Sequence, residues 1–402
     1  MTMRDVPLDN QIVLVRADYN VPLNGEGKIS DDLRITASLP TLKYLHDHNC
    51  KVVIISHLGR PEGQDSQFSL KQVAARLAEL LNHEVIFVDD TIGDKVKQAV
   101  RQAPAHSIIL LENLRYYKEE EADDAIFAKN IAEATGARYF VQDGFGVVHR
   151  AHASTHAITL CIPSVAGLLL EREYTVITSA MQNPERPLVA VMGGAKISDK
   201  IAVIEKFVEV ADKIIIGGAM ANTFLAYKGI KMGASKLEID QNETLDRIYH
   251  AAHEKVGDVV DTFIVLPSDV AVATEISKGS PRKNVALDQI SSDDIVLDLG
   301  DNSIEKIVEV IADAKTVIWN GTLGYAELPE FAHGSARLAL SLATQPYTTS
   351  IIGGGDTADF VLKWDSAKGA SFTHVSTGGG ASLELMAGEK LPGIESLLDA
   401  LK

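Results

Sequence analysis

Glycines and basic side chains follow the apolar, strand-like segments of this chain, where they could bind an anion. In the second half these segments end in Gly193–Gly194, Gly217–Gly218, Gly353–Gly355 and Gly378–Gly380. Glycine lets backbone N–H groups approach an anion, and the N-terminus of a following helix adds favourable polarity. If the strands are parallel, all four turns meet at one edge of the sheet. The pattern predicts a nucleotide-phosphate site built from several strand ends.

The apolar segments of the first half end instead in arginine, histidine and other polar residues. The polar residues that follow them are Asp18, Asn20, Arg34, His57, Arg60, Arg115 and Arg150. Two guanidinium groups about 5 Å apart repel by roughly 3 kcal/mol at an effective dielectric near 20. Arginine also presents a planar fork that matches phosphate or carboxylate. Clustered arginines therefore indicate a small dianionic substrate.

Each of these signals has an ordinary structural explanation. A single arginine after a strand is more often part of a surface ion pair, and a single Gly-Gly is usually a tight turn. The segment GGAKISDK lacks Walker A spacing, and His57, His149, His152 and His156 have no suitable metal-ligand spacing. The acidic run Glu119–Glu121 is expected to be a solvated helix start. The prediction rests on the joint pattern.

The composition is that of a globular enzyme. The 402 residues suffice for two or three domains, and 46% are apolar. The longest apolar run, Ile158–Leu170, contains Pro163 and is too short to span a membrane. A net charge of −17 argues against nucleic acid and anionic membranes as partners. Two isolated cysteines and the lack of a signal-peptide pattern favour a cytoplasmic protein.

The elements that must position these residues alternate between strand and helix. Strands are predicted at Gln11–Val15, Lys51–Ser56, Val85–Val88, Ser107–Leu111 and Arg138–Val141. Helices are predicted at Thr36–His46, Ser69–Leu81, Asp123–Ala134 and Ser164–Gln182. The alternation favours an α/β fold with two similar doubly wound parallel-sheet (Rossmann-like) domains. We expect domains at 1–165 and 184–384, joined by a hinged helix at 166–183.

Long motifs in a fixed order resemble those of the phosphoglycerate kinase family over essentially the whole chain. They include VRADYNVP, SHLGRP, ENLR, GGAKISDK, GGAMANTFL, WNGTLGYAE, GGGDT and STGGGASLE. The resemblance implies a hinge-bending enzyme of glycolysis and gluconeogenesis that transfers a phosphoryl group between 1,3-bisphosphoglycerate and ADP. It also implies a monomer that acts on small-molecule substrates, and a C-terminal tail, 385–402, that packs on the N-terminal domain.

The resemblance assigns roles residue by residue. Asp18, Asn20, Arg34, His57, Arg60, Arg115 and Arg150 match the positions for 3-phosphoglycerate. The nucleotide positions are matched by Lys196, Lys200, Gly217, Gly218, Asn320, Glu327, Gly354, Gly355, Asp356 and Thr357. Asp356 would hold Mg²⁺, and the catalytic groups would be Arg34, Lys196, Gly355 and Gly379. Lys196 and Lys200 are expected one helical turn apart on the same face.

The chain departs from the family pattern at a few positions. Gly144 replaces the alanine of DAFG, Val147–Val148 replaces Thr-Ala, and Thr322 and Ala326 replace proline and phenylalanine in the nucleotide loop. A carboxylate acceptor is already ionised at neutral pH, so the reaction needs no general base. One rival is a non-catalytic sugar-phosphate sensor, although such a protein has no need for both lysines and Asp356. A dinucleotide-dependent dehydrogenase is much weaker, since no GxGxxG motif is present.

Overall fold

The computed structural model describes residues 1–399 and contains two compact units. The first unit comprises Met1–Thr175 together with the segment from Lys390 onward, and the second comprises Val176–Glu389. The division falls inside helix α5 (Leu168–Gln182), which begins in the first unit and ends in the second. Among the described residues, no helix is long and apolar enough to cross a membrane.

The first unit is built on a six-stranded sheet in which every pairing is parallel. In spatial order the strands are β3 (Val85–Val88), β4 (Ile108–Leu111), β2 (Lys51–Ile55), β1 (Ile12–Arg16), β5 (Tyr139–Gln142) and β6 (Ser164–Ala166). Its helices are α1 (Leu33–Asp47), α2 (Lys71–Leu81), α3 (Gly93–Gln102) and α4 (Ala125–Thr135). Parallel strands bring their carboxyl ends to one edge, and there the predicted substrate residues follow β1, β2, β4 and β5.

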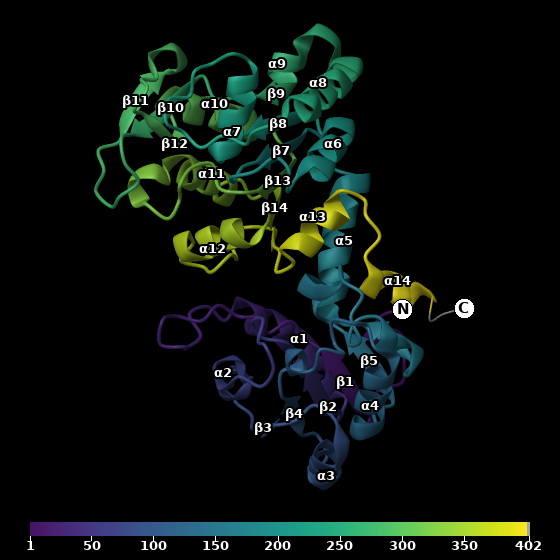
Figure 1. Cartoon of the computed structure of the whole chain (residues 1–402). Helices are drawn as coiled ribbons and strands as arrows, with labels where there is room; N and C mark the ends of the chain where they lie inside the picture. The colour runs from purple at the N-terminus through teal and green to yellow at the C-terminus, as the bar shows by residue number, and fades with distance from the viewer. Residues whose placement is uncertain (400–402) are drawn as a thin grey trace. The chain divides into compact units, whose positions relative to one another are not determined.

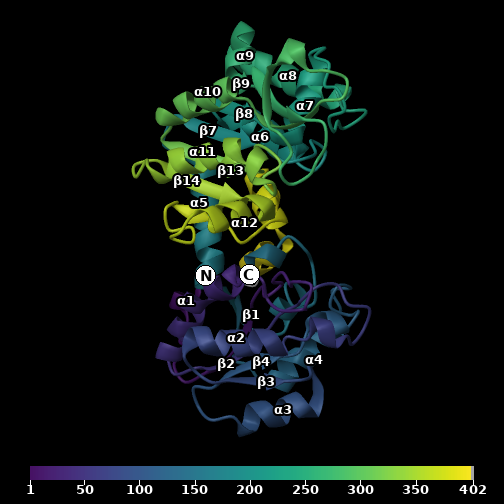
Figure 2. The same ribbon diagram turned by 90° about the vertical axis from the view of Figure 1, so that its left-hand side faces the viewer.

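Side-chain alternation along the strands explains the two layers of helices around this sheet (Figure 2). Val13 and Val15 of β1 pack in a core with residues of α1 and α2. Leu14, between them in sequence, packs with residues of α3 and α4 on the other face. Both faces are therefore covered, as the continuous apolar strands predict.

One predicted helix starts too early. Ser164–Ala166 forms β6, which pairs with β5 through Phe140, Val141 and Gln142, and the helix begins only at Leu168. Pro163 precedes this segment and Gly167 follows it. Val165 is almost fully buried as a strand residue. Helix-type periodicity continued into Ser164–Ala166 in the sequence, but tertiary pairing decides such a short apolar segment.

The second unit has its own six-stranded parallel sheet. In spatial order its strands are β15 (His374–Val375), β14 (Thr349–Gly353), β13 (Thr316–Asn320), β7 (Leu188–Met192), β8 (Lys213–Ile216) and β9 (Ile264–Val265). Its helices are α6 (Ile201–Val210), α7 (Gly218–Tyr227), α8 (Asn242–Val256), α9 (Val260–Phe263), α10 (Asp301–Ala312), α11 (His333–Ala343), α12 (Gly355–Trp364) and α13 (Gly380–Met386). The predicted class, two parallel-sheet α/β domains, is confirmed.

A second, three-stranded sheet in this unit has no counterpart in the sequence prediction. It is antiparallel, in the order β11 (Lys283–Ala286), β10 (Asp269–Ala273) and β12 (Ile295–Leu299). Three of the four residues of β11 are exposed, so that strand carries almost no apolar signal. This sheet forms part of the candidate site described below.

The chain returns to its first unit after α13. Helix α14 (Pro392–Asp399), yellow in Figure 1, lies near the N-terminus. Gly393 donates its backbone N–H to the Val148 carbonyl at 2.8 Å, and the Ser396 hydroxyl reaches the Thr155 carbonyl at 3.4 Å. Residues 400–402 of the predicted tail lie outside the described residues.

Candidate functional site

The carboxyl edge of the first sheet carries a buried ionic cluster. Asp18 follows β1, pairs with the Arg34 guanidinium and lies 3.9 Å from Nδ1 of His57, which follows β2. Burial opposes ionisation of Asp18, but Arg34, His57 and Arg16 outweigh it and lower its pKa to about 2. Burial also lowers the pKa of His57 well below its usual value. The cluster therefore presents a carboxylate and a neutral imidazole at neutral pH.

Arg16, the last residue of β1, is buried and contacts this cluster through His57. Its Nε donates to the Ser154 hydroxyl at 2.7 Å, and Nη2 lies 3.2 Å from Nδ1 of His57. Glu120, 4.0 Å from Arg16, accepts from the Ser154 hydroxyl at 2.6 Å. Glu120 is only 1% exposed, although Glu121 is exposed, so the expected solvated helix start at Glu119–Glu121 is wrong both in the helix start and for Glu120. The helix begins later, at Ala125, and Glu120 is buried because it pairs with the buried Arg16.

Two further predicted residues, Asn20 and Arg115, contact the turn after β2 at Gly59. The Asn20 side chain accepts from the Gly59 N–H at 2.8 Å, and Arg115 donates to the Gly59 carbonyl at 2.6 Å. Arg60 and Arg150 are exposed, and both lower the pKa of Arg115, although burial is the larger cause. Three guanidinium groups thus influence one another at the same edge, as the sequence predicts for an anion site.

The glycine turns of the second unit pack backbone against backbone. Gly218 donates to the Leu323 carbonyl at 3.0 Å, and Gly194 donates to the Thr322 carbonyl at 2.9 Å. Gly218 has φ +62°, and a Cβ there would lie 2.6 Å from the Gly194 nitrogen. Only glycine fits this close approach. The turns after β7, β8 and β13 therefore pack together as one cluster. Backbone hydrogen bonds hold the loop at Thr322, although it lacks the proline of the family pattern.

Two glycines after β14 and β15, Gly355 and Gly379, are different, whereas a Cβ on Gly353 or Gly354 would lie 3.1 or 3.2 Å from the Asn320 side chain. A Cβ on Gly355, at the start of α12, or on Gly379, just before α13, would meet no protein atom within 4 Å. No packing in the described residues requires glycine at Gly355, and a positive φ of +52° is the only internal reason for it at Gly379. These turns leave open space at a helix N-terminus, the geometry that suits an approaching phosphate.

Lys196 and Lys200 do not share a helical face as predicted, because α6 begins only at Ile201. Lys200 is largely buried, and its ammonium donates to the carbonyls of Gly193 at 2.9 Å and Asn320 at 3.1 Å. Burial lowers the pKa of Lys200 to about 8, partly opposed by Asp356. Lys196 is exposed. One lysine is fixed by the turns and the other extends into solvent.

The remaining predicted nucleotide residues surround the same strand ends. Thr357 accepts from the Gly321 N–H at 2.7 Å, and the buried Asn320 side-chain nitrogen has no partner. Asp356 and Glu327 are exposed and line one pocket with Gly194 and Gly218. Among the described residues, no group of three or more His, Cys, Asp or Glu could hold a metal ion. A metal at Asp356 must therefore complete its coordination with phosphate and water, which Mg²⁺ does readily.

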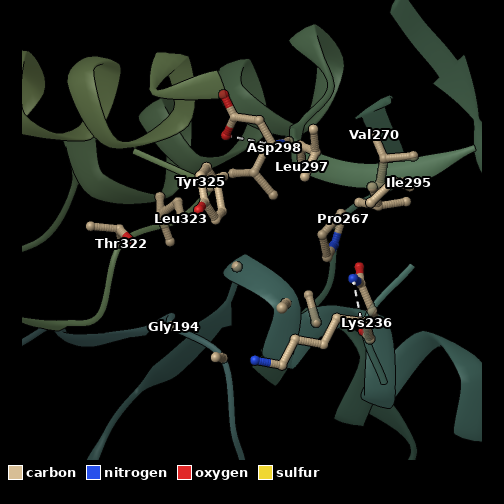
Figure 3. A pocket seen from close by; sticks show the side chains of 18 of the residues that line it. Gly194, Lys236, Pro267, Val270, Ile295, Leu297, Asp298, Thr322, Leu323 and Tyr325 are labelled. Carbon is tan, nitrogen blue, oxygen red and sulfur yellow. Dashed lines mark hydrogen bonds between the residues drawn. The ribbon is translucent and has the colours of Figure 1, made fainter. Parts of the chain in front are cut away.

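The pocket beside these turns has a volume of about 210 Å³ (Figure 3). Thr322, Leu323 and Tyr325 lie on one side of it, and Gly194 and Lys236 lie on the other. The unpredicted three-stranded sheet supplies an apolar wall that includes Val270, Ile295 and Leu297. Sequence reasoning missed Lys236 and Asp298, which also line the pocket, because neither follows a strand–glycine turn.

The chain is similar in sequence and in fold to known proteins of one family. The family model described as phosphoglycerate kinase matches residues 3–389. The phosphoglycerate kinase of Dictyoglomus turgidum is 43% identical over 399 residues, covering 99% of this chain and 98% of its own. That of Pseudothermotoga lettingae is 44% identical over 404 residues, covering 100% and 99%. A solved phosphoglycerate kinase structure from Coxiella burnetii superposes with a TM-score of 0.86 at 35% identity, covering 100% of both chains.

Proposed function

The chain belongs to the phosphoglycerate kinase family, and we propose that it catalyses the family's reaction. The reaction is the reversible, Mg²⁺-dependent transfer of the acyl phosphate of 1,3-bisphosphoglycerate to ADP, which gives ATP and 3-phosphoglycerate in glycolysis or gluconeogenesis. The acceptor in the reverse direction is a carboxyl group. The observation that supports the proposal is the clustering of arginines at the carboxyl edge of one sheet and of glycine turns at the strand ends of the other.

The first unit binds 3-phosphoglycerate in this proposal. Arg60, Arg115 and Arg150 provide guanidinium groups for its dianionic phosphate, which relieves their mutual repulsion. Asn20 orients the Gly59 turn, and the Asp18 carboxylate orients Arg34. Arg34 is partly exposed, so its guanidinium can contact a reacting group while Nη1 stays paired with Asp18.

The second unit binds the nucleotide. Lys200 holds the strand-end turns and the phosphates, and the exposed Lys196 neutralises charge on the transferring phosphoryl group. A Cβ at Gly355 or Gly379 would meet no protein atom within 4 Å, so a phosphate can approach these turns, and their N–H groups would donate to the same charge. Mg²⁺ would be held by Asp356, where it would neutralise charge on the nucleotide phosphates. No general base is needed, because the attacking carboxylate is already ionised.

Substrate and nucleotide residues belong to different units, so transfer requires the units to close. We propose that the two ends of α5 act as the hinge. Closure would expel water from the reacting groups and suppress ATP hydrolysis.

The proposal is tested by a coupled assay with 3-phosphoglycerate, ATP and Mg²⁺. The expected result is ADP formation that requires 3-phosphoglycerate and is lost with EDTA. Binding of both ligands without turnover would support the sugar-phosphate sensor instead. Failure to bind either ligand would contradict both proposals.

Arg34→Ala tests the mechanism within this assay. The variant should lose at least about 100-fold in kcat, the loss typical of one transition-state donor, with a much smaller change in KM for 3-phosphoglycerate. Arg34→Lys keeps the charge but not the fork, and should recover only part of the loss. A near-normal kcat in Arg34→Ala would remove Arg34 from the catalytic groups.

A further inference from the structure

A buried hydrogen-bond network links Glu120, through Ser154 and Arg16, to one ring nitrogen of His57. The Ser154 hydroxyl donates to Oε1 of Glu120 at 2.6 Å and accepts from Nε of Arg16 at 2.7 Å. Nη2 of Arg16 then lies 3.2 Å from Nδ1 of His57. Each of these side chains belongs to a residue that is at most 3% exposed. Segments far apart in the sequence therefore converge on this one nitrogen.

The contact between Arg16 and His57 determines the tautomer of the imidazole. A guanidinium group has N–H donors and no acceptor, so this contact is a hydrogen bond only if Nδ1 carries no proton. Asp18 would favour a proton on Nδ1, but its Oδ1 is 3.9 Å away, beyond hydrogen-bonding distance. Burial, helped by the charge of Arg16 and opposed by Asp18, lowers the pKa of His57, so the ring is neutral at pH 7. Its one proton therefore lies on Nε2.

Nε2 is the ring nitrogen of His57 that is left for a ligand. It makes no hydrogen bond within the described part of the chain, and it is not among the buried side-chain atoms that lack a partner. It therefore keeps contact with solvent, although most of the ring is buried. An N–H at this position can donate to an oxygen of a bound anion, whereas the lone pair of an unprotonated nitrogen would repel that oxygen.

The carboxylate of Glu120 holds the far end of the network. It accepts from the Ser154 N–H at 3.1 Å as well as from the hydroxyl, and its Oε1 lies 4.0 Å from Nη2 of Arg16. Burial raises the pKa of Glu120, and Arg16 and both Ser154 donors oppose this. Because two donors and a cation face the carboxylate, they favour its ionised form. Without it, the buried guanidinium of Arg16 would lose its compensating charge.

We propose that Glu120 and Ser154 are positioning residues for the substrate side of the reaction. They keep Arg16 donating to Nδ1 of His57, so that the ring presents its Nε2–H to 3-phosphoglycerate. This inference rests on the proposed function, which places that substrate at the carboxyl edge of the first sheet. Neither positioning residue needs to touch the substrate. Their effect is to select the one neutral form of the ring that can donate at Nε2.

Two substitutions at His57 test which ring nitrogen donates. The amide of His57→Gln can reach the position of Nε2, whereas the shorter amide of His57→Asn reaches only the position of Nδ1. Both variants should weaken binding of 3-phosphoglycerate, measured by calorimetry on the full chain. His57→Asn should lose at least about tenfold more affinity than His57→Gln, the value of one hydrogen bond to a charged group. An equal loss, or a larger loss in His57→Gln, would overturn a donor at Nε2.

Nitrogen NMR on the full chain with isotope-labelled histidine reads the protonation of both ring nitrogens without substrate. The His57 signals are those missing from His57→Gln. We expect the native chain to show a proton on Nε2 and none on Nδ1. Ser154→Ala interrupts the network but leaves both buried charges in place. It should mix the two tautomers and weaken 3-phosphoglycerate binding about tenfold, with ADP affinity unchanged within about twofold.

Glu120→Gln should change the spectrum and the affinity in the same direction. Its amide would turn a donor toward the donors of Ser154 and leave Arg16 without an anionic partner. If this variant does not fold, Ser154→Ala carries the test alone. The matched control is Glu119→Gln, which changes the preceding, less buried carboxylate and should keep the native spectrum and the native affinity.

The spectrum of the native chain can overturn the inference by itself, if it shows the proton on Nδ1 or on both ring nitrogens. Native affinity in Ser154→Ala would contradict the positioning role. So would a folded Ser154→Ala that loses affinity while His57 keeps its native spectrum, because the hydroxyl would then act on the fold and not on the ring. If the native chain does not bind 3-phosphoglycerate at all, the proposed function fails instead, and the spectrum still decides the tautomer.

Discussion

At the scale of single residues, the substrate-side cluster depends on charges that are buried and yet paired. Asp18 is 7% exposed and contacts Arg34, while the Asn20 N–H donates to its other oxygen at 3.1 Å. Removing one partner of a buried pair leaves the other charge uncompensated, which is strongly destabilising. If the first unit binds the substrate as proposed, Asp18 couples that binding to the stability of this unit.

Asp18→Asn should show this coupling through pH. The pKa of Asp18 falls from 3.8 to about 2 in the folded protein. Ionised Asp18 therefore adds to the free energy of unfolding above pH 4, and this contribution is lost as the pH falls toward 2. At pH 7 the variant should be less stable by about 2 kcal/mol, and the deficit should shrink below pH 4. Urea denaturation across this range checks it. Asp47→Asn, at an exposed site in the same unit, should change stability little. A pH-independent deficit would contradict the electrostatic explanation.

At the scale of elements, the glycine turns fall into two groups that the sequence does not separate. A Cβ on Gly218 would collide with the turns after β7 and β13, whereas a Cβ on Gly355 would meet no protein atom within 4 Å. The first group holds the strand ends together. The second, Gly355 and Gly379, faces open space that a bound phosphate could enter.

Substitution by alanine should separate these groups. Gly355→Ala should fold with native stability, because the first residue of α12 tolerates alanine, but lose about tenfold or more in nucleotide affinity or kcat. Gly218→Ala should instead lower the stability of the fold, because φ is positive at this position and the added Cβ would lie 2.6 Å from the Gly194 backbone nitrogen. Thermal denaturation and steady-state kinetics on both variants check this. Native kinetics in Gly355→Ala would show that the open space is not used.

The start of α5 depends on a buried carboxyl group. Asp143, after β5, accepts from the Leu169 N–H at 3.0 Å, while its second oxygen, Oδ2, has no hydrogen-bond partner. Thr41 accepts from the Leu168 N–H at 3.0 Å, so two side chains of the first unit cap this helix. Burial raises the pKa of Asp143 to about 7.

Asp143→Asn should therefore stabilise the protein increasingly as pH rises. Between about pH 4 and 7 the folded state retains a proton that the unfolded state has released, so native stability falls over this interval. The amide of the variant does not titrate, so its stability lacks this dependence on pH. The gain in free energy of unfolding over the native chain should be absent below pH 4 and reach a few kcal/mol above pH 7. Chemical denaturation at several pH values measures it. Asp124→Asn, which removes the charge but keeps the capping oxygen at the less buried N-cap of α4, is the control and should show no such rise. A constant difference would exclude proton linkage at Asp143.

At the scale of the whole molecule, the sequence predicted the features that repeat along the chain, the strand–helix alternation and the strand ends. It missed the features that depend on contacts between residues far apart in the sequence. The βαβ alternation predicted two parallel sheets, and the strand-end rule predicted that Arg34, His57 and Arg115 share an edge. It could not show that Glu120 is buried, since that depends on Arg16 and Ser154 from other segments. Neither could it place Lys236, because the pocket wall is completed by β12, whose pairing with β10 is nonlocal.

The last helix of the chain belongs to the first unit, and this predicts how a truncation should act. Leu391, Ile394 and Leu397 are buried there, and α14 contacts the backbone at Val148 and Thr155. These two residues flank the segment that carries Arg150 and Ser154. Ending the chain after Glu389 should therefore weaken 3-phosphoglycerate binding about tenfold or more through loss of this support, and leave ADP binding within about twofold.

Calorimetry with each ligand on the same truncated protein checks this prediction, and hydrogen exchange should show loss of protection confined to the first unit. Glu395→Gln, which changes only a partly exposed carboxylate on α14, should bind both ligands normally. Gly393→Ala is a finer variant, because its Cβ would lie 3.0 Å from the Val148 Cα and displace the helix without shortening the chain. It should weaken 3-phosphoglycerate binding in the same direction. An equal loss of ADP affinity in the truncated protein would instead mean that α14 supports the second unit as well.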